Sequence, residues 1–140
     1  MKNFLTDVMA GISGFIGSIS PGRAIPKWEA QLREGDSRDA QIARAHLLEA
    51  YKRVDRLTDA RRVYDDALKN LQYVSYDGVE WLEAYVLAQL AGYEYAVLKD
   101  CDLAHERARA AYEIANASGD KRTSGPVIAL LKMDFPDLDF

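Results

Sequence analysis

Cys101 and His105 are the two residues whose types and spacing come closest to a reactive site. Residues four apart lie on one face of a helix, so the thiol and the imidazole could form a nucleophilic pair or supply two ligands to a metal ion. A structural zinc site needs four ligands, and the chain has no second cysteine and only one other histidine, His46. We therefore expect all three side chains to serve ordinary packing, and we expect no metal and no cofactor.

The acidic residues and the glycines do not form a catalytic pattern either. Two pairs of carboxylates occur in charged surroundings, Asp65 with Asp66 and Asp137 with Asp139. Acid–base catalysis needs a protected pair with separated pKa values, so both pairs are interpreted as solvated. The glycines at positions 11, 14 and 17 follow no strand and lack the spacing of a dinucleotide-binding loop. No set of nucleophile, base and oxyanion or metal site emerges, and we predict that the protein is not an enzyme.

Composition limits the partners and the compartment. The chain has 140 residues, of which 49% are apolar and 29% charged, a balance typical of one soluble globular domain. The formal net charge is −4, so no basic excess is available to neutralise phosphates, and nucleic acid is not an expected partner. A single cysteine cannot form an internal disulfide. The chain also has no run of about 18 uncharged apolar residues, the length that a transmembrane helix needs. We predict a cytoplasmic protein, with attachment to a membrane surface as the alternative.

The distribution of proline and glycine divides the chain into three parts. Residues 1–22 are rich in Gly and Ser, and the four prolines all lie outside residues 27–125. That long stretch contains no alternating run typical of a β-strand, so it is predicted to be helix joined by short turns. The sequence Ser-Gly-Pro at residues 124–126 is expected to open a last helix, at about residues 124–133. The predicted fold class is therefore all-α, with residues 23–140 as one helical domain.

A short segment recurs at the period of a helical repeat. Leu-Glu-Ala-Tyr occurs at residues 48–51 and again at residues 82–85, so the two copies start 34 residues apart. The pattern Ala-x3-Tyr-x2-Ala follows each copy, at residues 60–67 and 108–115. This period and these motifs resemble the tetratricopeptide repeat family, in which helical hairpins stack into a solenoid. Residues 41–72 resemble one full repeat, with Leu48 where a small residue is usual and Gln72 where Pro often closes the unit.

The resemblance implies a short solenoid of antiparallel helical hairpins at about residues 38–71 and 78–118. In this family the small residue of the second helix allows close packing, so Ala60 and Ala108 are expected to be buried where helices cross. These two alanines lie 48 residues apart rather than 34, an addition close to four helical turns. The second hairpin should therefore have longer helices. The first is expected at residues 78–99 with Asp77 as N-cap, and the second at residues 102–118 with Asp102 as N-cap and Gly119 as the C-terminal stop. A degenerate half-repeat is expected at Ala24, Trp28 and Gln31.

The resemblance also implies a concave surface formed by the first helix of each hairpin. The residues predicted to contact a partner there are Glu49, Lys52, Arg53, Tyr76, Glu83, Val86 and Leu87. Family members that bind a terminal carboxylate use Lys and Asn in this surface, whereas this chain has Ala45 and Glu49. A helix or an extended peptide is therefore the expected ligand. Changing Lys52 and Arg53 to Glu should weaken binding with little loss of stability. The alternative is that Lys52, Arg53 and Arg56 are only a solvated charged face.

Residues 1–22 combine an apolar helix face with glycines that weaken a helix. Apolar side chains follow steps of three and four, and Ala10, Gly14 and Ser18 place small residues on another side. The residues predicted to dock are Phe4, Leu5, Val8, Ile12, Gly14, Phe15, Ile16 and Ile19. A helix with three glycines is unstable alone in water, so this one should pack against something. Three alternatives remain: the edge of the repeat stack, a membrane interface, and an oligomer or a partner's groove.

The leading functional hypothesis is an adaptor or assembly factor that binds another protein through the concave face of the hairpins. A second hypothesis starts from the run between Phe15 and Ala24, which resembles the N-terminal leader of tailed-phage portal proteins. It implies a structural or membrane-associated component of a multi-subunit assembly that docks through residues 1–22. Two repeats are fewer than such stacks normally need, so self-association into a homo-oligomer is a further possibility.

Overall fold

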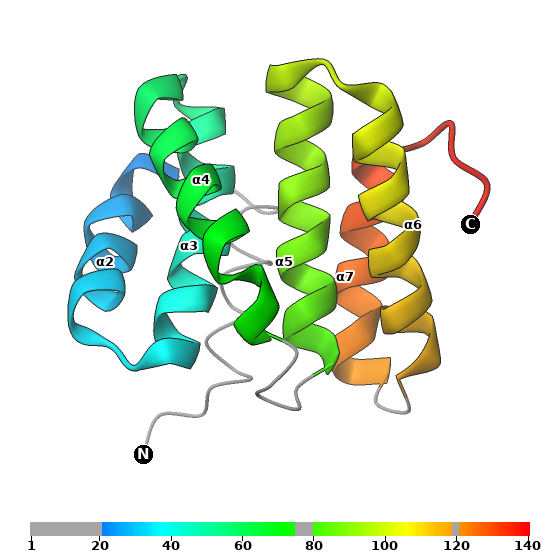
Figure 1. The fold of residues 1–140 in the computed structure, drawn as a ribbon, viewed down its shortest axis with the longest axis horizontal. Helices are drawn as coiled ribbons and strands as arrows, with labels where there is room; N and C mark the ends of the chain where they lie inside the picture. The colour runs from blue at the N-terminus through cyan, green and yellow to red at the C-terminus, as the bar shows by residue number, and fades with distance from the viewer. Residues whose placement is uncertain (1–20, 75–79, 119–120) are drawn as a thin grey trace. The chain divides into compact units, whose positions relative to one another are not determined.

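A computed structural model of the chain describes residues 21–74, 80–118 and 121–140 (Figure 1). The helices in these ranges are α2 (Pro21–Glu34), α3 (Ser37–Arg53), α4 (Leu57–Val74), α5 (Glu80–Tyr93), the π-helix η2 (Glu94–Leu98), α6 (Cys101–Ala117) and α7 (Lys121–Asp134). No strand occurs in the three ranges, so the prediction of an all-α chain is confirmed. The chain divides into two compact units, residues 1–69 and 70–140.

In the first unit, α2 packs along α3. Ile25 and Trp28, three residues apart on α2, are both buried, as helical spacing on one face requires. The side-chain amide of Gln31 donates to the backbone carbonyl of Asp39 at 3.1 Å. This hydrogen bond ties the end of α2 to the start of α3.

Two short turns set the boundaries of α3. Asp36 has an extended backbone, and its side chain accepts a hydrogen bond from the N–H of Asp39 at 2.8 Å, which makes it the N-cap. At the other end, Asp55 adopts a φ of 62°, a left-handed conformation that Asp tolerates better than most residues. The N–H of Arg56 then reaches the carbonyl of Tyr51 at 2.9 Å, and α4 begins at the next residue.

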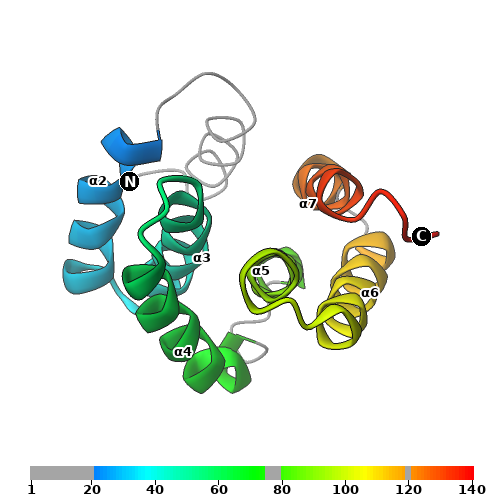
Figure 2. The same cartoon turned by 90° about the horizontal axis from the view of Figure 1, so that it is seen from above.

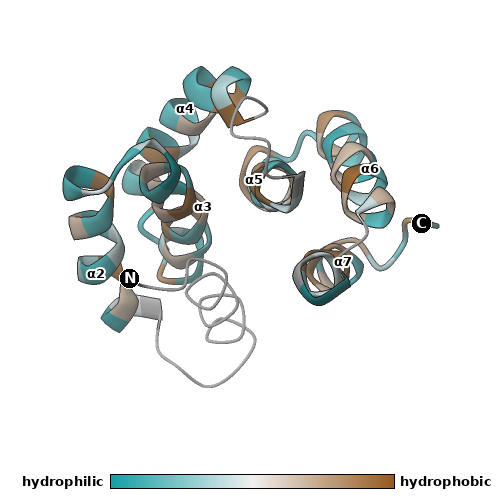
Figure 3. Ribbon diagram, turned by 90° about the horizontal axis from the view of Figure 1, so that it is seen from below, coloured by the Kyte–Doolittle hydropathy of each residue, from teal (hydrophilic) through white to brown (hydrophobic). Residues whose placement is uncertain are grey.

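The second unit places α5, α6 and α7 around one core. Figure 2 views these helices from above, with one at each corner of a triangle, and each of the three packs against the other two. In Figure 3, α6 carries both teal and brown residues, as expected of an amphipathic helix. The apolar stripe of α6 consists of Ala104, Ala108, Ala111 and Ala115, all fully buried. Ala60 of α4 is also fully buried, so the burial predicted for Ala60 and Ala108 is confirmed.

A π-helical turn joins α5 to α6. η2 ends at Leu98, and its C-cap is Lys99, which has a φ of 59°. The carbonyl of Glu94 accepts hydrogen bonds from the N–H groups of Lys99 and Asp100. The side chain of Asp100 accepts from the N–H of Leu103 at 3.2 Å, so Asp100 is the N-cap of α6. The prediction of Asp102 as the cap is wrong, because the left-handed residue at 99 ends the preceding turn two residues earlier. Asp102 lies in the first turn instead. The predicted cap Asp77 and stop Gly119 lie outside the described residues.

Two prolines lie inside helices of the structure rather than at helix ends. α7 begins at Lys121, so the expectation that Pro126 opens this helix is wrong, and Pro126 lies inside it. α2 likewise begins at Pro21 and contains Pro26. A proline removes one hydrogen-bond donor, but near the start of a helix that loss is confined to the first turns.

Candidate functional site

The predicted contact residues of α3 form a charge cluster at its last turn. Glu49 is buried, with 4% of its surface exposed. Its two carboxylate oxygens pair with neighbouring cations: Oε2 lies 2.9 Å from Nζ of Lys52, and Oε1 accepts from Nε of Arg53 at 2.7 Å. The three residues are at spacings of three and four, so one helix face brings them together.

The environment of Glu49 keeps it charged. Burial acts to raise the pKa of its carboxyl, but the charges and hydrogen bonds of Lys52 and Arg53 outweigh burial, and the pKa of Glu49 lies below its ordinary value. The side chains of Lys52 and Arg53 remain 18% and 34% exposed. The cluster therefore presents two cations to solvent, both held by one buried anion.

These ion pairs change what a charge reversal at the cluster would do. Glu at positions 52 and 53 would set two more anions beside the buried carboxylate of Glu49. An uncompensated buried charge is strongly destabilising. The expectation that reversing Lys52 and Arg53 leaves stability nearly unchanged therefore needs revision, and a neutral replacement is the better probe.

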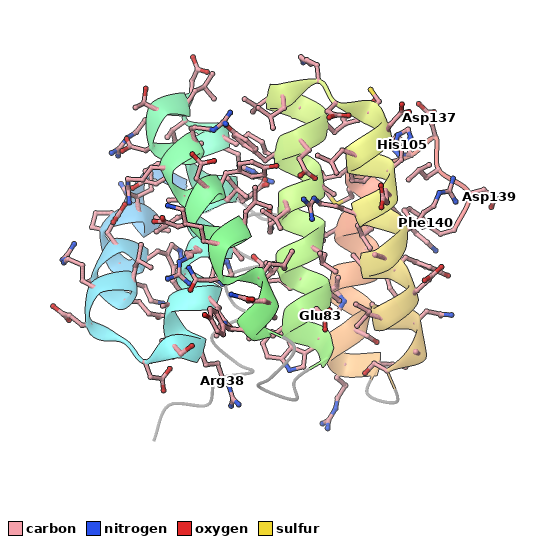
Figure 4. All side chains as sticks on the ribbon, in the orientation of Figure 1. Arg38, Glu83, His105, Asp137, Asp139 and Phe140 are labelled. Atoms are coloured by element: carbon pink, nitrogen blue, oxygen red, sulfur yellow. The ribbon has the colours of Figure 1, made fainter. Side chains whose placement is uncertain are left out.

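The predicted contact residues of the second unit lie on α5. Glu83 is half-buried and is seen toward the lower end of α5 in Figure 4. Val86 and Leu87 are buried, with 4% and 8% of their surfaces exposed. Tyr76, predicted to join them, lies outside the described residues. A role in partner binding stays a prediction for all four.

A stacked pair in the first unit was not predicted from the sequence. The rings of Trp28 and His46 lie 4.1 Å apart between centroids, at an interplanar angle of 28°. Nζ of Lys27 is 4.7 Å from the Trp28 ring centroid. Burial, and then the charge of Lys27, lower the pKa of His46 to about 3, so the imidazole is neutral at physiological pH. His46 is fully buried against an aromatic ring, a packing role like the one expected for it.

Glu29 of α2 joins all three helices of the first unit. The hydroxyl of Tyr51 on α3 donates to Oε1 of Glu29. Nη2 of Arg62 on α4 donates to the same oxygen at 3.0 Å. The partners lie 22 and 33 residues from Glu29, and no local spacing in the sequence indicates such a junction.

The second unit contains a buried ion pair at the π-helical turn. Glu94 is fully buried, and its Oε2 accepts from Nε of Arg107 on α6 at 2.6 Å. One turn earlier on α5, Nε2 of Gln89 lies 3.3 Å from the hydroxyl of Tyr85, and both residues are buried. π-Helical turns are frequent at functional sites, yet here the polar atoms hold helices together.

Cys101 and His105 occupy different surroundings. Cys101 is exposed at the start of α6. The His105 ring packs against two aromatic rings, with centroids 6.0 Å from Tyr95 and 5.9 Å from Phe135. Within the described ranges, no group of three or more His, Cys, Asp and Glu side chains could hold a metal ion. Likewise, no helix of the described part of the chain is long and apolar enough to cross a membrane.

The predicted docking segment lies outside the described residues, since Phe4, Gly14 and Ile19, with the others of that set, precede residue 21. No protein-family profile, no curated protein and no solved structure matches the chain. The resemblances to tetratricopeptide repeats and to portal leaders therefore remain hypotheses.

Proposed function

We propose that the chain is a non-enzymatic interaction protein that binds a helix or an extended segment of another protein. The observation that carries this proposal is the cluster of Glu49, Lys52 and Arg53 on α3. A partner that places a carboxylate beside this turn meets two cations whose positions the buried Glu49 already restricts. Less side-chain freedom is then lost on binding than with two free cations, which raises the affinity.

The proposal includes a tetratricopeptide-like arrangement of helical hairpins. Two observations support it, each within one unit. The Leu, Ala and Tyr residues of both Leu-Glu-Ala-Tyr segments are buried, at residues 48–51 and 82–85. Ala60 and Ala108, the small residues at matching positions of the second helices, are both fully buried. In such an arrangement α3 and α5 are the first helices of their hairpins and carry the binding residues.

The experiment uses the full chain against a displayed library of random linear peptides. Peptides selected by the wild type are labelled and measured by fluorescence anisotropy with Arg53→Met and Lys52→Met. Each variant leaves Glu49 with one cation, so the chain should stay folded. Arg61→Met is the matched control, because Arg61 also pairs with a carboxylate four residues away, Asp65 at 3.2 Å, but on α4 rather than α3.

The expected result is peptides that contain acidic residues and bind both cluster variants about tenfold more weakly than wild type, the loss of one charged hydrogen bond. Arg61→Met should bind as the wild type does. Equal binding by all four proteins, with unchanged melting temperatures, would return Lys52 and Arg53 to the role of a solvated charged face.

A further inference from the structure

Residues 135–140 fold back onto α6 after α7 ends. Figure 4 shows His105 on α6, with Asp137, Asp139 and Phe140 following the outer side of the same helix. The segment reads Phe-Pro-Asp-Leu-Asp-Phe and has an aromatic residue at each end. Both aromatic rings contact rings of the second unit, so the segment lies on this unit as a short peptide ligand lies on its receptor.

The first anchor, Phe135, belongs to the core. It is 3% exposed, and its N–H donates to the carbonyl of Leu131 at 2.9 Å, which continues the hydrogen bonding of α7. Its ring meets Tyr95 edge-on at 5.3 Å between centroids and His105 at 5.9 Å. Releasing Phe135 would open the core, so this end of the segment is fixed.

The second anchor, Phe140, is held by much less. Its ring stacks on Tyr112 with centroids 4.8 Å apart and an interplanar angle of 26°. Between the anchors, the N–H of Leu138 donates to the carbonyl of Phe135 at 3.2 Å, which closes a turn that has proline at its second position. Asp137 and Asp139 are exposed, and both aromatic rings of the stack are half-exposed. Residues 136–140 can therefore leave without opening the core.

We infer that the face of α6 around Tyr112 binds a short segment of a partner protein, an aromatic residue preceded by acidic ones, and that residues 136–140 occupy this face as a built-in competitor. The inference is independent of the charge cluster on α3 and does not rest on it. An aromatic ring offers a stacking surface that any second aromatic ring can use in the same way.

The stripe of α6 that carries Tyr112 also carries one exposed cation. His105, Arg109 and Tyr112 follow steps of four and three, so they share one stripe of the helix, and Arg109 is its exposed cation. Glu106 and Glu113 lie three residues before and four residues after Arg109, so they flank this cation on one side of the stripe. A ligand that follows this stripe toward Tyr112 passes Arg109.

The built-in competitor sets the size of the expected effect. A ligand on a short tether acts at an effective concentration of about 1 mM. If the same segment binds as a free peptide with a Kd of about 100 µM, the tethered copy occupies the site roughly ten to one. Removing its anchor should then raise the apparent affinity for an external peptide about tenfold.

The test uses full-length chains and the fluorescein-labelled peptide Met-Asp-Phe-Pro-Asp-Leu-Asp-Phe, the sequence of residues 133–140. Binding is measured by anisotropy for the wild type and Phe140→Ala. In the Phe140→Ala background, Tyr112→Ala and Arg109→Glu probe the site. Tyr73→Ala is the matched control, since Tyr73 is another tyrosine on the surface, 50% exposed on α4. Melting temperatures show whether each variant is folded, and Arg109→Glu remains informative if Tyr112→Ala is not.

We expect Phe140→Ala to bind the peptide about tenfold more tightly than the wild type does. In that background, Tyr112→Ala should abolish binding, Arg109→Glu should weaken it and Tyr73→Ala should leave it unchanged. Equal affinity of wild type and Phe140→Ala would overturn it, as would full binding by Tyr112→Ala. Sedimentation of the wild type tests whether a second copy of this chain occupies the face instead. A dimer that depends on concentration and disappears in Phe140→Ala would assign the face to a second copy of this chain and would also overturn the inference.

Discussion

The two Leu-Glu-Ala-Tyr segments, at residues 48–51 and 82–85, place three of their four side chains alike and the fourth differently. Leucine, alanine and tyrosine are at most 2% exposed in both copies. The glutamates differ, because Glu49 is buried between two cations while Glu83 is half-buried. The apolar positions follow from the helical pattern in each segment, whereas burial of the carboxylate depends on Lys52 and Arg53, which have no counterpart after Glu83.

The same lesson holds for the tyrosine hydroxyls and for the second motif. Tyr51 donates to Glu29 of another helix, whereas Tyr85 lies within hydrogen-bonding distance of Gln89 of its own helix. Tyr64 of the first Ala-x3-Tyr-x2-Ala motif is buried, whereas Tyr112 of the second is half-exposed beneath Phe140. A repeated pattern fixes which positions face inward, and neighbours from elsewhere in the chain decide what their polar ends meet.

The largest expected effect compares the two buried carboxylates. Arg107→Met removes the cation that pairs with the fully buried Glu94, and breaking such a pair costs about 3 kcal/mol of unfolding free energy. Arg53→Met should cost less than about 1 kcal/mol, because Glu49 keeps Lys52. Denaturant unfolding measures both values. Replacing both Glu94 and Arg107 by Leu should recover much of the loss, and similar losses in the two single variants would contradict the comparison.

Added volume at the two matched alanines tests whether the second helices pack alike. Ala60→Leu and Ala108→Leu insert three carbons at fully buried positions, and overpacking typically costs about 1–3 kcal/mol. Thermal melts of both variants should show similar losses. Ala117→Leu, at an exposed position of α6, is the control and should leave the melting temperature nearly unchanged. An unaffected Ala60→Leu or Ala108→Leu would mean that the helix register is wrong.

His46 should give the first unit a pH dependence of its own. Its pKa is about 3 in the folded chain and about 6.5 when unfolded, so below pH 6.5 the unfolded state binds a proton that the folded state does not. The free energy of unfolding therefore decreases as the pH is lowered, by about 2 kcal/mol from pH 7 to pH 5. His46→Phe keeps a ring against Trp28 and should lose this component. Parallel pH curves for the two proteins would show that His46 is not buried as neutral imidazole.

The smallest effect compares one glycine from each unit. A Cβ at Gly35 would lie 2.4 Å from Cβ of Asp39 and 2.7 Å from the carbonyl oxygen of Gln31, so Gly35→Ala should destabilise by at least about 1 kcal/mol. Apart from its chain neighbours, nothing lies within 4 Å of a Cβ at Gly125 inside α7, but the ring of Pro126 disfavours a Cβ on the helical residue before it. Gly125→Ala should therefore change stability less than Gly35→Ala does. Chemical denaturation measures both changes, and a stabilising Gly35→Ala would contradict the close approach of α2 and α3.

The sequence predicted the fold class and two buried positions. The all-α class followed from the placement of the prolines and the lack of alternating runs, and the burial of Ala60 and Ala108 was implied by the resemblance to tetratricopeptide repeats. The junction of Glu29 with Tyr51 and Arg62 could not be foreseen, because its members lie 22 and 33 residues apart and meet only after the helices pack. The cap of α6 was missed for a different reason. Asp100 and Asp102 are equally good caps by residue type, and the left-handed backbone at residue 99 selects between them.

The resemblance to tetratricopeptide repeats implied that Lys52 and Arg53 are binding residues, but it did not show which group holds them. Glu49 was predicted to face a partner, yet its carboxylate is turned into the cluster and engaged by both cations. The spacing of three and four is visible in the sequence, but whether such a glutamate is buried depends on packing. The face around Tyr112 was missed because Phe140 follows it by 28 residues and nothing local connects them.

Glu94 links two levels of structure in one residue. Its backbone carbonyl receives the N–H groups of Lys99 and Asp100 and so closes the π-helical turn, while its carboxylate binds Arg107 of α6. Moving Glu94 itself out of the turn would also separate its buried carboxylate from Arg107. In hydrogen-exchange terms, the amides of residues 99 and 100 should therefore exchange more slowly than their exposed positions alone suggest, because their acceptor is held by a contact with α6.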